Sequence, residues 1–311
     1  MQSVDISLSL PSAVPGYPAG RARRAGILLT VMLSCLLAAG CISTRFIYNQ
    51  LDWLIVWYLN DFFSLDAAQE DELRGIVSRN LDWVRTEQLP EYARLLRVIE
   101  AEIDDQSLSV DDIDQHFQEM IGLWDAFLRK VTPDAAIFLS ALSDAQVADF
   151  LTNVEDNNQE LWEDYAGESA EKRLERRQKT AIKGFQRFTG RLDARQRELV
   201  SRHVARMSDN SVEWLQGRRA WQNSFQSLVQ ERPPKDELQA RLLDLMLNPN
   251  AGDSPEYRRK VEANQRIVFE MTVDLMQALN QRQRERLSAE LLGYATDFDK
   301  LAAQRLPNEA G

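Results

Sequence analysis

Four stretches of the chain share a pattern in which a leucine and a small polar residue precede two variable positions and a glutamine. They read Leu65-Asp66-Ala-Ala-Gln69, Leu142-Ser143-Asp-Ala-Gln146, Leu192-Asp193-Ala-Arg-Gln196 and Leu279-Asn280-Gln-Arg-Gln283. Apolar residues follow at helical spacing, as at Leu73, Ile76 and Val77. The pattern predicts that each stretch begins an amphipathic helix.

The chemistry of the pattern is that of a capping box with a hydrophobic staple. The polar residue can accept hydrogen bonds from free backbone N–H groups of the first turn, and the glutamine can reach back to the cap. The leucine packs onto the same turn. We therefore predict N-caps at Asp66, Ser143, Asp193 and Asn280, each stabilising its helix by about 1 kcal/mol.

The motifs lie 77, 50 and 87 residues apart, which is too uneven for a solenoid repeat. They pair instead, 65 with 142 and 192 with 279. Each first motif opens a long helical stretch, with breaks expected near Pro90 and near Pro233-Pro234. Thr132-Pro133-Asp134 and Ser254-Pro255-Glu256 both fit a cap followed by proline at the first helical position. This pairing predicts a divergent tandem duplication.

The residues between these breaks are mostly Leu, Ala, Arg, Glu, Asp and Gln, which lose little side-chain entropy in helices. Glycine (13) and proline (10) are few, and hydrophobic residues make up 44% of the chain, enough for a core. We predict an all-α protein, an extended helical bundle of two duplicated helical-hairpin or cradle units. Those units are assigned to 65–190 and 191–301, with a flexible tail at 302–311.

Residues 25–39, AGILLTVMLSCLLAA, form an uncharged run that follows Arg21, Arg23 and Arg24. A helix that crosses a bilayer needs roughly 20 apolar residues, so this run is short for a span. Its length and basic flank are typical of a secretory signal. We therefore predict a signal peptide at 1–40.

The run ends in Leu37-Ala38-Ala39-Gly40-Cys41, which resembles the lipobox of bacterial lipoproteins. The resemblance implies cleavage before Cys41 and a lipid on its thiol, although Ala38 stands where Leu or Val is usual. The alternative is an ordinary signal peptide or short anchor that contains a cysteine. Residue 42 is Ile and not Asp, and by resemblance to Gram-negative lipoproteins this predicts an outer-membrane protein that faces the periplasm.

The segment that follows the lipobox, 41–64, is rich in aromatic residues, especially from Arg45 onward. One interpretation is an interfacial element beside the lipid, where Trp and Tyr rings are favoured. The other, which we favour, is a first helix buried against the core.

The chain carries a net charge of −11, and its first forty residues carry +2, so the remainder carries −13. A polyanion is repelled on average, so we do not expect a nucleic-acid partner. The charge-dense run from Glu168 through Arg177 to Arg197 could be a nucleic-acid or phospholipid patch. A solvated helix face with mixed charges is the interpretation we favour.

No motif for catalysis, metal or cofactor binding is visible. His116 and His203 lack ligand spacing and fit polar helix faces, and Cys41 alone in the mature chain leaves no disulfide. We expect no enzyme activity, no metal and no cofactor. Aromatic and methionine residues fit core stripes at helical spacing: Trp83, Trp124, Phe127, Trp162, Trp214, Trp221, Met246, Met271 and Met276. A client-binding surface could share some of them, and the sequence does not separate core from exposed patch.

The paired motif resembles the LTxxQ motif of small periplasmic stress chaperones of the Spy and CpxP type. The second half matches it best, through LDARQRELVSRHV, PPKDELQARLLDLM and LNQRQRERLSAEL. The resemblance implies a cradle of long helices that binds unfolded clients, although none of the four motifs has Thr at its second position. The whole chain also resembles an uncharacterised group of helical lipoproteins from Gram-negative bacteria.

Three functions follow as expectations. The first is a membrane-anchored, non-enzymatic envelope lipoprotein that binds proteins or peptides and acts like a chaperone. The second is a structural or scaffolding subunit of an envelope complex. The third is an enzyme without a recognisable motif, which we favour least.

Overall fold

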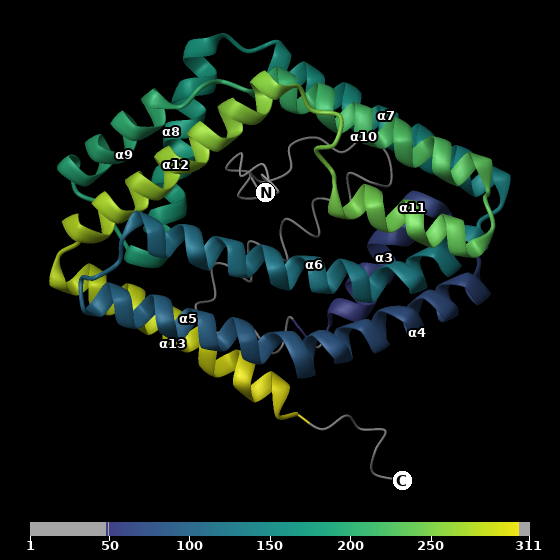
Figure 1. Cartoon of the computed structure of the whole chain (residues 1–311), viewed down its shortest axis with the longest axis horizontal. Helices are drawn as coiled ribbons and strands as arrows, with labels where there is room; N and C mark the ends of the chain where they lie inside the picture. Colours follow the sequence, from purple (N-terminus) through teal and green to yellow (C-terminus); the bar gives the residue numbers. More distant parts are fainter. Residues whose placement is uncertain (1–47, 49, 305–311) are drawn as a thin grey trace. The chain divides into compact units, whose positions relative to one another are not determined.

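A computed structural model of the chain describes residue 48 and residues 50–304 (Figure 1). The described part is helical and holds no β-strand, which confirms the all-α prediction. Its helices are α3 (Leu51–Phe63), α4 (Ala67–Trp83), the π-helix η1 (Val84–Gln88), α5 (Leu89–Asp104), α6 (Val110–Ser140), α7 (Asp144–Ala166), α8 (Ala170–Thr189), α9 (Ala194–Arg206), α10 (Ser211–Glu231), α11 (Lys235–Leu247), α12 (Pro255–Ala278) and α13 (Gln281–Ala302).

The helices form two compact units, each built from separate parts of the chain. Unit 1 consists of Ile99–Ala141 and Val154–Glu290. Unit 2 consists of the described residues up to Val98, Leu142–Asn153 and the described residues from Leu291 onward. The predicted division into 65–190 and 191–301 follows the sequence motifs, and it stays a prediction.

In unit 2, α3 packs against α4. Val56 and Phe63 of α3 are buried, and the Phe63 ring stacks on Phe150 with 4.7 Å between centroids. Trp53 and Tyr58, on the same helix, remain exposed. Part of α3 is therefore core, as the interpretation we favour predicts, and two of its largest rings face outward. An interfacial role beside a lipid stays a prediction.

The break expected near Pro90 is wrong, because helical backbone continues from α4 through η1 into α5. Proline in a helix lacks an N–H donor and crowds the carbonyl four residues earlier. That carbonyl belongs to Thr86, which lies in the wider turn of η1. A π-turn at this point accommodates the proline without ending the helix.

The cap expected at Thr132-Pro133 is also wrong, because Pro133 lies inside α6. Thr132 is fully buried, and its hydroxyl donates to the carbonyl oxygen of Leu128 at 2.5 Å. Ala136 and Leu139, one and two turns on, are buried as well. Packing of α6 on α11 thus outweighs the local preference of proline for a helix start.

The other two proline sites lie at helix starts. Ser254 caps α12, where its hydroxyl accepts from the backbone N–H of Tyr257 at 3.1 Å, and Pro255 opens the helix. At Pro233-Pro234 the chain leaves α10 and enters α11.

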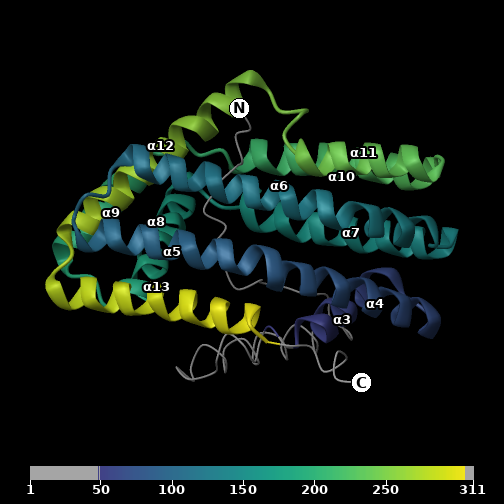
Figure 2. The ribbon, with the colours of Figure 1, turned by 60° about the horizontal axis from the view of Figure 1, so that its bottom comes forward.

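Unit 1 is a set of packed helices around α6 and α12 (Figure 2). Helix α6 packs on α11 and α12, α12 packs on α9, and α9 pairs with α8. Helix α10 runs beside α11. Fully buried side chains at these contacts include Val200, Val204, Met271 and Leu275, and burial of such side chains is the main stabilising term for the unit.

No single helix among the described residues is both long and apolar enough to cross a bilayer. The bent pair Val110–Ser140 and Asp144–Gln159 has the necessary length and composition only when its two helices are taken together.

Candidate functional site

Each of the four sequence motifs begins a helix in the structure. Asp66 and Asp193 accept from the backbone N–H of the glutamine three residues later, at 2.9 Å in both cases. Ser143 and Asn280 accept from the corresponding N–H at 3.2 and 3.0 Å. In all four, the glutamine Oε1 accepts from the backbone N–H of its cap. Leu142, Leu192 and Leu279 are buried and Leu65 is half-buried.

The structure also brings the motifs together in the predicted pairs. In unit 1, Gln196 Nε2 donates to Gln283 Oε1 at 2.7 Å, and Gln283 Nε2 donates to Gln196 Oε1 at 2.9 Å. The same Nε2 atoms donate to the carbonyl oxygens of Ala278 and Arg191, both at 2.9 Å. We call this reciprocal pair an amide clasp. It fastens the start of α9 to the start of α13.

A second amide clasp lies in unit 2. Gln146 Nε2 donates to Gln69 Oε1 at 2.6 Å, and Gln69 Nε2 donates back at 3.2 Å. Gln146 Nε2 also donates to the carbonyl oxygen of Ser64 at 3.3 Å. Since Gln146, Gln196 and Gln283 are buried, the clasps join helix starts and offer little surface to a ligand.

Both histidines are buried and each bonds one carboxylate. His116 Nε2 lies 2.7 Å from Glu102 Oε2, and His203 Nε2 lies 2.8 Å from Asp274 Oδ2. The prediction that they sit on polar helix faces is therefore wrong. Packing around each imidazole turns it inward, and the carboxylate satisfies one of its ring nitrogens.

The expected core stripes are only partly core. Met271 is fully buried, whereas Trp124 and Trp162 are 49% and 42% exposed, which contradicts the prediction for these two. Trp214 and Trp221 are half-buried, and both line a cavity. Helical spacing identifies the face on which an aromatic residue lies, but it does not show whether another helix covers that face.

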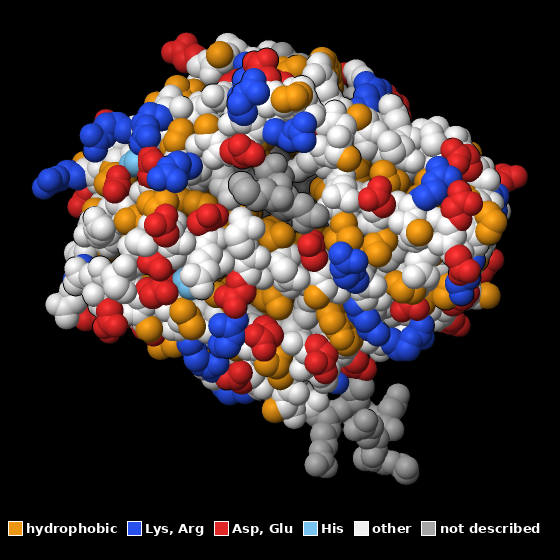
Figure 3. Space-filling model, viewed as in Figure 1, with side chains coloured by type: hydrophobic (Ala, Val, Ile, Leu, Met, Phe, Trp, Pro, Cys, Tyr) orange, Lys and Arg blue, Asp and Glu red, His pale blue; other side chains and the backbone are white. Residues whose placement is uncertain are grey.

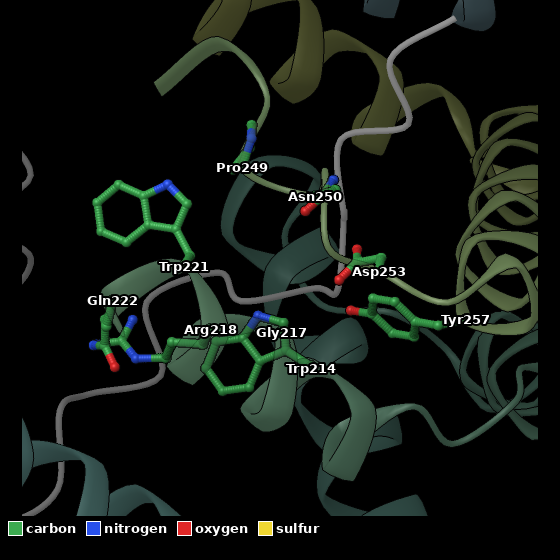
Figure 4. A pocket seen from close by; sticks show the side chains of 9 residues that line it. All are labelled: Trp214, Gly217, Arg218, Trp221, Gln222, Pro249, Asn250, Asp253 and Tyr257. Atoms are coloured by element: carbon green, nitrogen blue, oxygen red, sulfur yellow. The ribbon is translucent and has the colours of Figure 1, made fainter. Parts of the chain in front are cut away.

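That cavity is the candidate functional site of unit 1, and we call it the aromatic pocket (Figure 4). Its volume is about 280 Å³. It lies between one face of α10, the loop before α12 and the first turn of α12. Its lining consists of Trp214, Gly217, Arg218, Trp221, Gln222, Pro249, Asn250, Asp253 and Tyr257.

The wall on α10 follows from helical spacing. Its five residues are separated by three, one, three and one positions, so they share one face of the helix. Gly217 lies in the middle of that face, and a Cβ at this position would meet Asp253 Oδ1 at 2.8 Å. A side chain at this position would therefore displace the carboxylate of Asp253, which now lies against α10.

Arg218 is the basic residue of the pocket. Its guanidinium lies over the Trp214 ring, 5.9 Å from the centroid, which is a cation–π arrangement. Its Nη2 donates to Asn157 Oδ1 at 3.3 Å, and Asn158 in turn donates to Gln222 Oε1 at 2.7 Å. This network from α7 fixes the polar side chains at the edge of the pocket.

The remaining rings are also held in place. Trp221 Nε1 donates to the carbonyl oxygen of Leu245 at 2.8 Å, and the Trp221 ring stacks on Phe225. Tyr257 is buried, and its hydroxyl points toward Asp253 in Figure 4. The aromatic wall is thus positioned before any ligand binds, which reduces the entropy cost of binding.

An ion pair joins the two helices that carry the pocket. Lys260 Nζ on α12 lies 2.6 Å from Glu213 Oε1 on α10. The hydrogen bond from Lys260 holds the pKa of the Glu213 carboxyl below its usual range. The same bond raises the pKa of Lys260. The two charges therefore stabilise each other and link α10 to α12.

The sequence interpretation missed most of this pocket. It assigned Trp214 and Trp221 to core stripes, and it did not single out Arg218, Asp253 or Tyr257. The available signal was a glycine and an arginine between two tryptophans on one helix face. The loop and the first turn of α12 could not be placed against that face from the sequence.

Within residues 48 and 50–304, no group of three or more His, Cys, Asp or Glu side chains is placed to hold a metal ion. The predicted signal peptide and Cys41 lie outside the described residues.

The sequence of the chain matches one known protein family. Residues 61–258 match DUF6279, a family of unknown function. The chain belongs to this family. The matched region contains three of the four motifs and the whole aromatic pocket. This agrees with the expectation of an uncharacterised helical family. Neither the curated proteins nor the solved structures yielded a match.

Proposed function

We propose that this protein is a non-enzymatic lipoprotein of the cell envelope that binds segments of proteins or peptides through the aromatic pocket. In this proposal, Cys41 carries the lipid anchor and the helical part faces the periplasm from the outer membrane. The observation that carries the proposal is the preorganised, solvent-accessible set of aromatic and polar side chains at the pocket.

The chemistry of the lining suits a polypeptide. Trp214 and Trp221 supply apolar area at low entropy cost, and Trp is enriched where proteins bind other proteins. Tyr257 is buried and supports this wall from behind. Asn250 and Gln222 supply amide groups that can pair with a peptide backbone. At about 280 Å³ the cavity is just below the roughly 300–1,000 Å³ of drug-sized sites, so it fits one or two side chains.

Two features of the sequence support the same proposal. The lipobox-like residues before Cys41 suit an anchored envelope protein. The four paired motifs resemble those of the Spy and CpxP chaperones, which supports a chaperone-like role. Because fold alone does not carry function, the pocket and not the resemblance is the basis of the proposal.

The proposal is tested in two ways. The full chain, purified in detergent, should suppress aggregation of a chemically unfolded client protein at equal molar ratio. In cells, wild-type chain should fractionate with outer membranes, and a Cys41→Ala variant should leave that fraction. A chain that suppresses no aggregation would contradict peptide binding, and a Cys41→Ala variant that stays in the membrane fraction would contradict lipid anchoring.

A scaffolding role in an envelope complex is the second candidate. It is favoured by the exposed rings of Trp53 and Tyr58 on α3, because large exposed aromatic residues are typical of protein docking surfaces. A single stoichiometric partner, together with no activity on unfolded clients, would support this candidate over the first.

A further inference from the structure

Helices α8 and α9 are strongly basic within an acidic protein. Between residues 171 and 206 the chain has 12 Lys and Arg and four Asp and Glu, a net charge of +8, whereas the whole chain carries −11. Lys and Arg side chains gather on the face shown in Figure 3 at the place where Figure 1 labels α9. The charge of unit 1 is therefore unevenly distributed.

The cations of α8 form a stripe along one side of the helix. With 3.6 residues per turn and a rise of 1.5 Å, their spacing confines them to about 80° of the helix surface over about 22 Å. Ala181, on the opposite side, is 2% exposed and belongs to the core. We call the following set the basic stripe: Lys172, Arg176, Lys179, Lys183 and Arg187.

Most of the basic stripe is available for binding. Arg176 and Lys179 pair with Glu168 and Glu175, at 2.7 and 2.6 Å, and such surface pairs are weak. The other three cations are exposed, and in the described part of the chain no carboxylate lies within ion-pair distance of them: Lys172, Lys183 and Arg187.

Two other cations of α8 have a different role. Arg173 Nε donates to Asp209 Oδ2 at 2.6 Å, and Arg177 Nη1 donates to the carbonyl oxygen of Ser208 at 3.2 Å. They bind the turn between α9 and α10 and so fix the rotation of α8. The basic stripe is consequently held outward as a rigid row.

We propose that the basic stripe docks onto the phosphate headgroups of an anionic phospholipid surface. A row of cations about 22 Å long suits a flat array of phosphates, to which Lys and Arg donate charge-assisted hydrogen bonds. Each Lys or Arg near such a surface strengthens partitioning roughly fivefold. The acidic remainder of the chain is screened beyond a Debye length of about 8 Å at physiological salt.

A lipid surface is favoured over an acidic protein because of the proposed anchor. This step rests on the membrane anchoring in the proposed function. A tethered chain is held near the membrane at a high effective concentration. Even a modest attraction is then enough to bring the basic stripe onto the lipid surface. The basic stripe and the aromatic pocket share no residue, so each can be changed by substitution without altering the other.

The test uses lysine labelling of the full chain reconstituted into vesicles. One set contains phosphatidylcholine alone, and the other contains one part of phosphatidylglycerol to two of phosphatidylcholine. An amine-reactive reagent and mass spectrometry report each lysine. We expect Lys172, Lys179 and Lys183 to react several-fold more slowly in the anionic vesicles, with Lys130 and Lys235 unchanged. In 1 M salt, where the Debye length is about 3 Å, the difference should vanish.

Equal rates for all lysines in the two kinds of vesicle would overturn the proposal. Because reconstitution places the chain on the membrane without processing at Cys41, this failure is distinct from a failure of lipid anchoring. It is also distinct from a failure of client binding, which is measured without vesicles.

Matched variants show whether the protection depends on the basic stripe or on net charge alone. Lys172→Gln, Lys183→Gln and Arg187→Gln together should weaken anionic partitioning about 100-fold and abolish the protection of Lys179. The control triple changes the net charge equally at exposed positions elsewhere: Arg74→Gln, Arg129→Gln and Lys235→Gln. Equal loss of Lys179 protection in both triples would show a general charge effect and would contradict docking through the stripe.

Discussion

At the scale of single residues, the glutamine of each motif uses both ends of its amide. In unit 1, Gln196 Oε1 accepts from the cap Asp193 and from Gln283, while Gln196 Nε2 donates to Gln283 and to the carbonyl oxygen of Ala278. Both glutamines are buried, so removal of one leaves the polar atoms of the other without partners. An unpaired buried polar group costs more than the hydrogen bond it loses.

A double-mutant cycle measures this coupling. Gln196→Ala and Gln283→Ala should each lower the free energy of unfolding by about 2–3 kcal/mol, and the double variant should lose about 1 kcal/mol less than the sum. Urea unfolding of the full chain gives the values. Gln281→Ala, at an exposed position on α13, is the control and should change stability by less than about 0.5 kcal/mol. Strictly additive losses would mean that the two amides do not act as a pair.

At the scale of helices, the turn from α9 to α10 is held by charged groups of α8. Burial alone would raise the pKa of Asp209, but hydrogen bonds from Ser211 and Arg173 outweigh it and hold that pKa below its usual value. A carboxyl with a depressed folded-state pKa stabilises the fold above its unfolded pKa, about 3.9. This stabilisation is lost as the pH falls through the folded pKa.

Acid sensitivity therefore tests the turn. Asp209→Asn should lower the urea midpoint at pH 6, and the deficit relative to wild type should shrink as the pH falls below about 4. The urea midpoints of both proteins are measured between pH 6 and pH 2.5. Glu262→Gln, which removes a carboxylate on the exposed side of α12, is the control variant. A deficit that stays constant over this range would exclude the ionised Asp209 as the stabilising species.

How far the sequence predicts these elements depends on the range of the forces involved. The caps at Asp66 and Asp193 were predictable because a capping box is complete within four residues. Thr132-Pro133 also carries a local signal for a helix start, a cap residue followed by proline, but burial within α6 overrides it. The partners of the clasps were suggested only by the pairing of motifs. The aromatic pocket was not predictable, because it forms only where the loop that carries Asp253 packs against Gly217 of α10. The sequence does not show this contact between distant segments.

At the scale of the whole molecule, three surfaces divide the work. The amide clasps fasten helix starts within each unit. The basic stripe is proposed to contact an anionic surface, and the aromatic pocket is proposed to bind a peptide. The family match over 61–258 includes both the pocket and the stripe.

The most direct test of the central claim is equilibrium binding of a fluorescein-labelled, permanently unfolded polypeptide, followed by anisotropy. Trp214→Ala should weaken binding by about tenfold, because truncation of a central aromatic residue costs more than about 1 kcal/mol. Gly217→Val should do the same by displacing Asp253. Trp162→Ala, which removes an exposed ring outside the pocket, is the control and should leave the Kd unchanged. Equal affinities for wild type and both pocket variants would contradict peptide binding at this site.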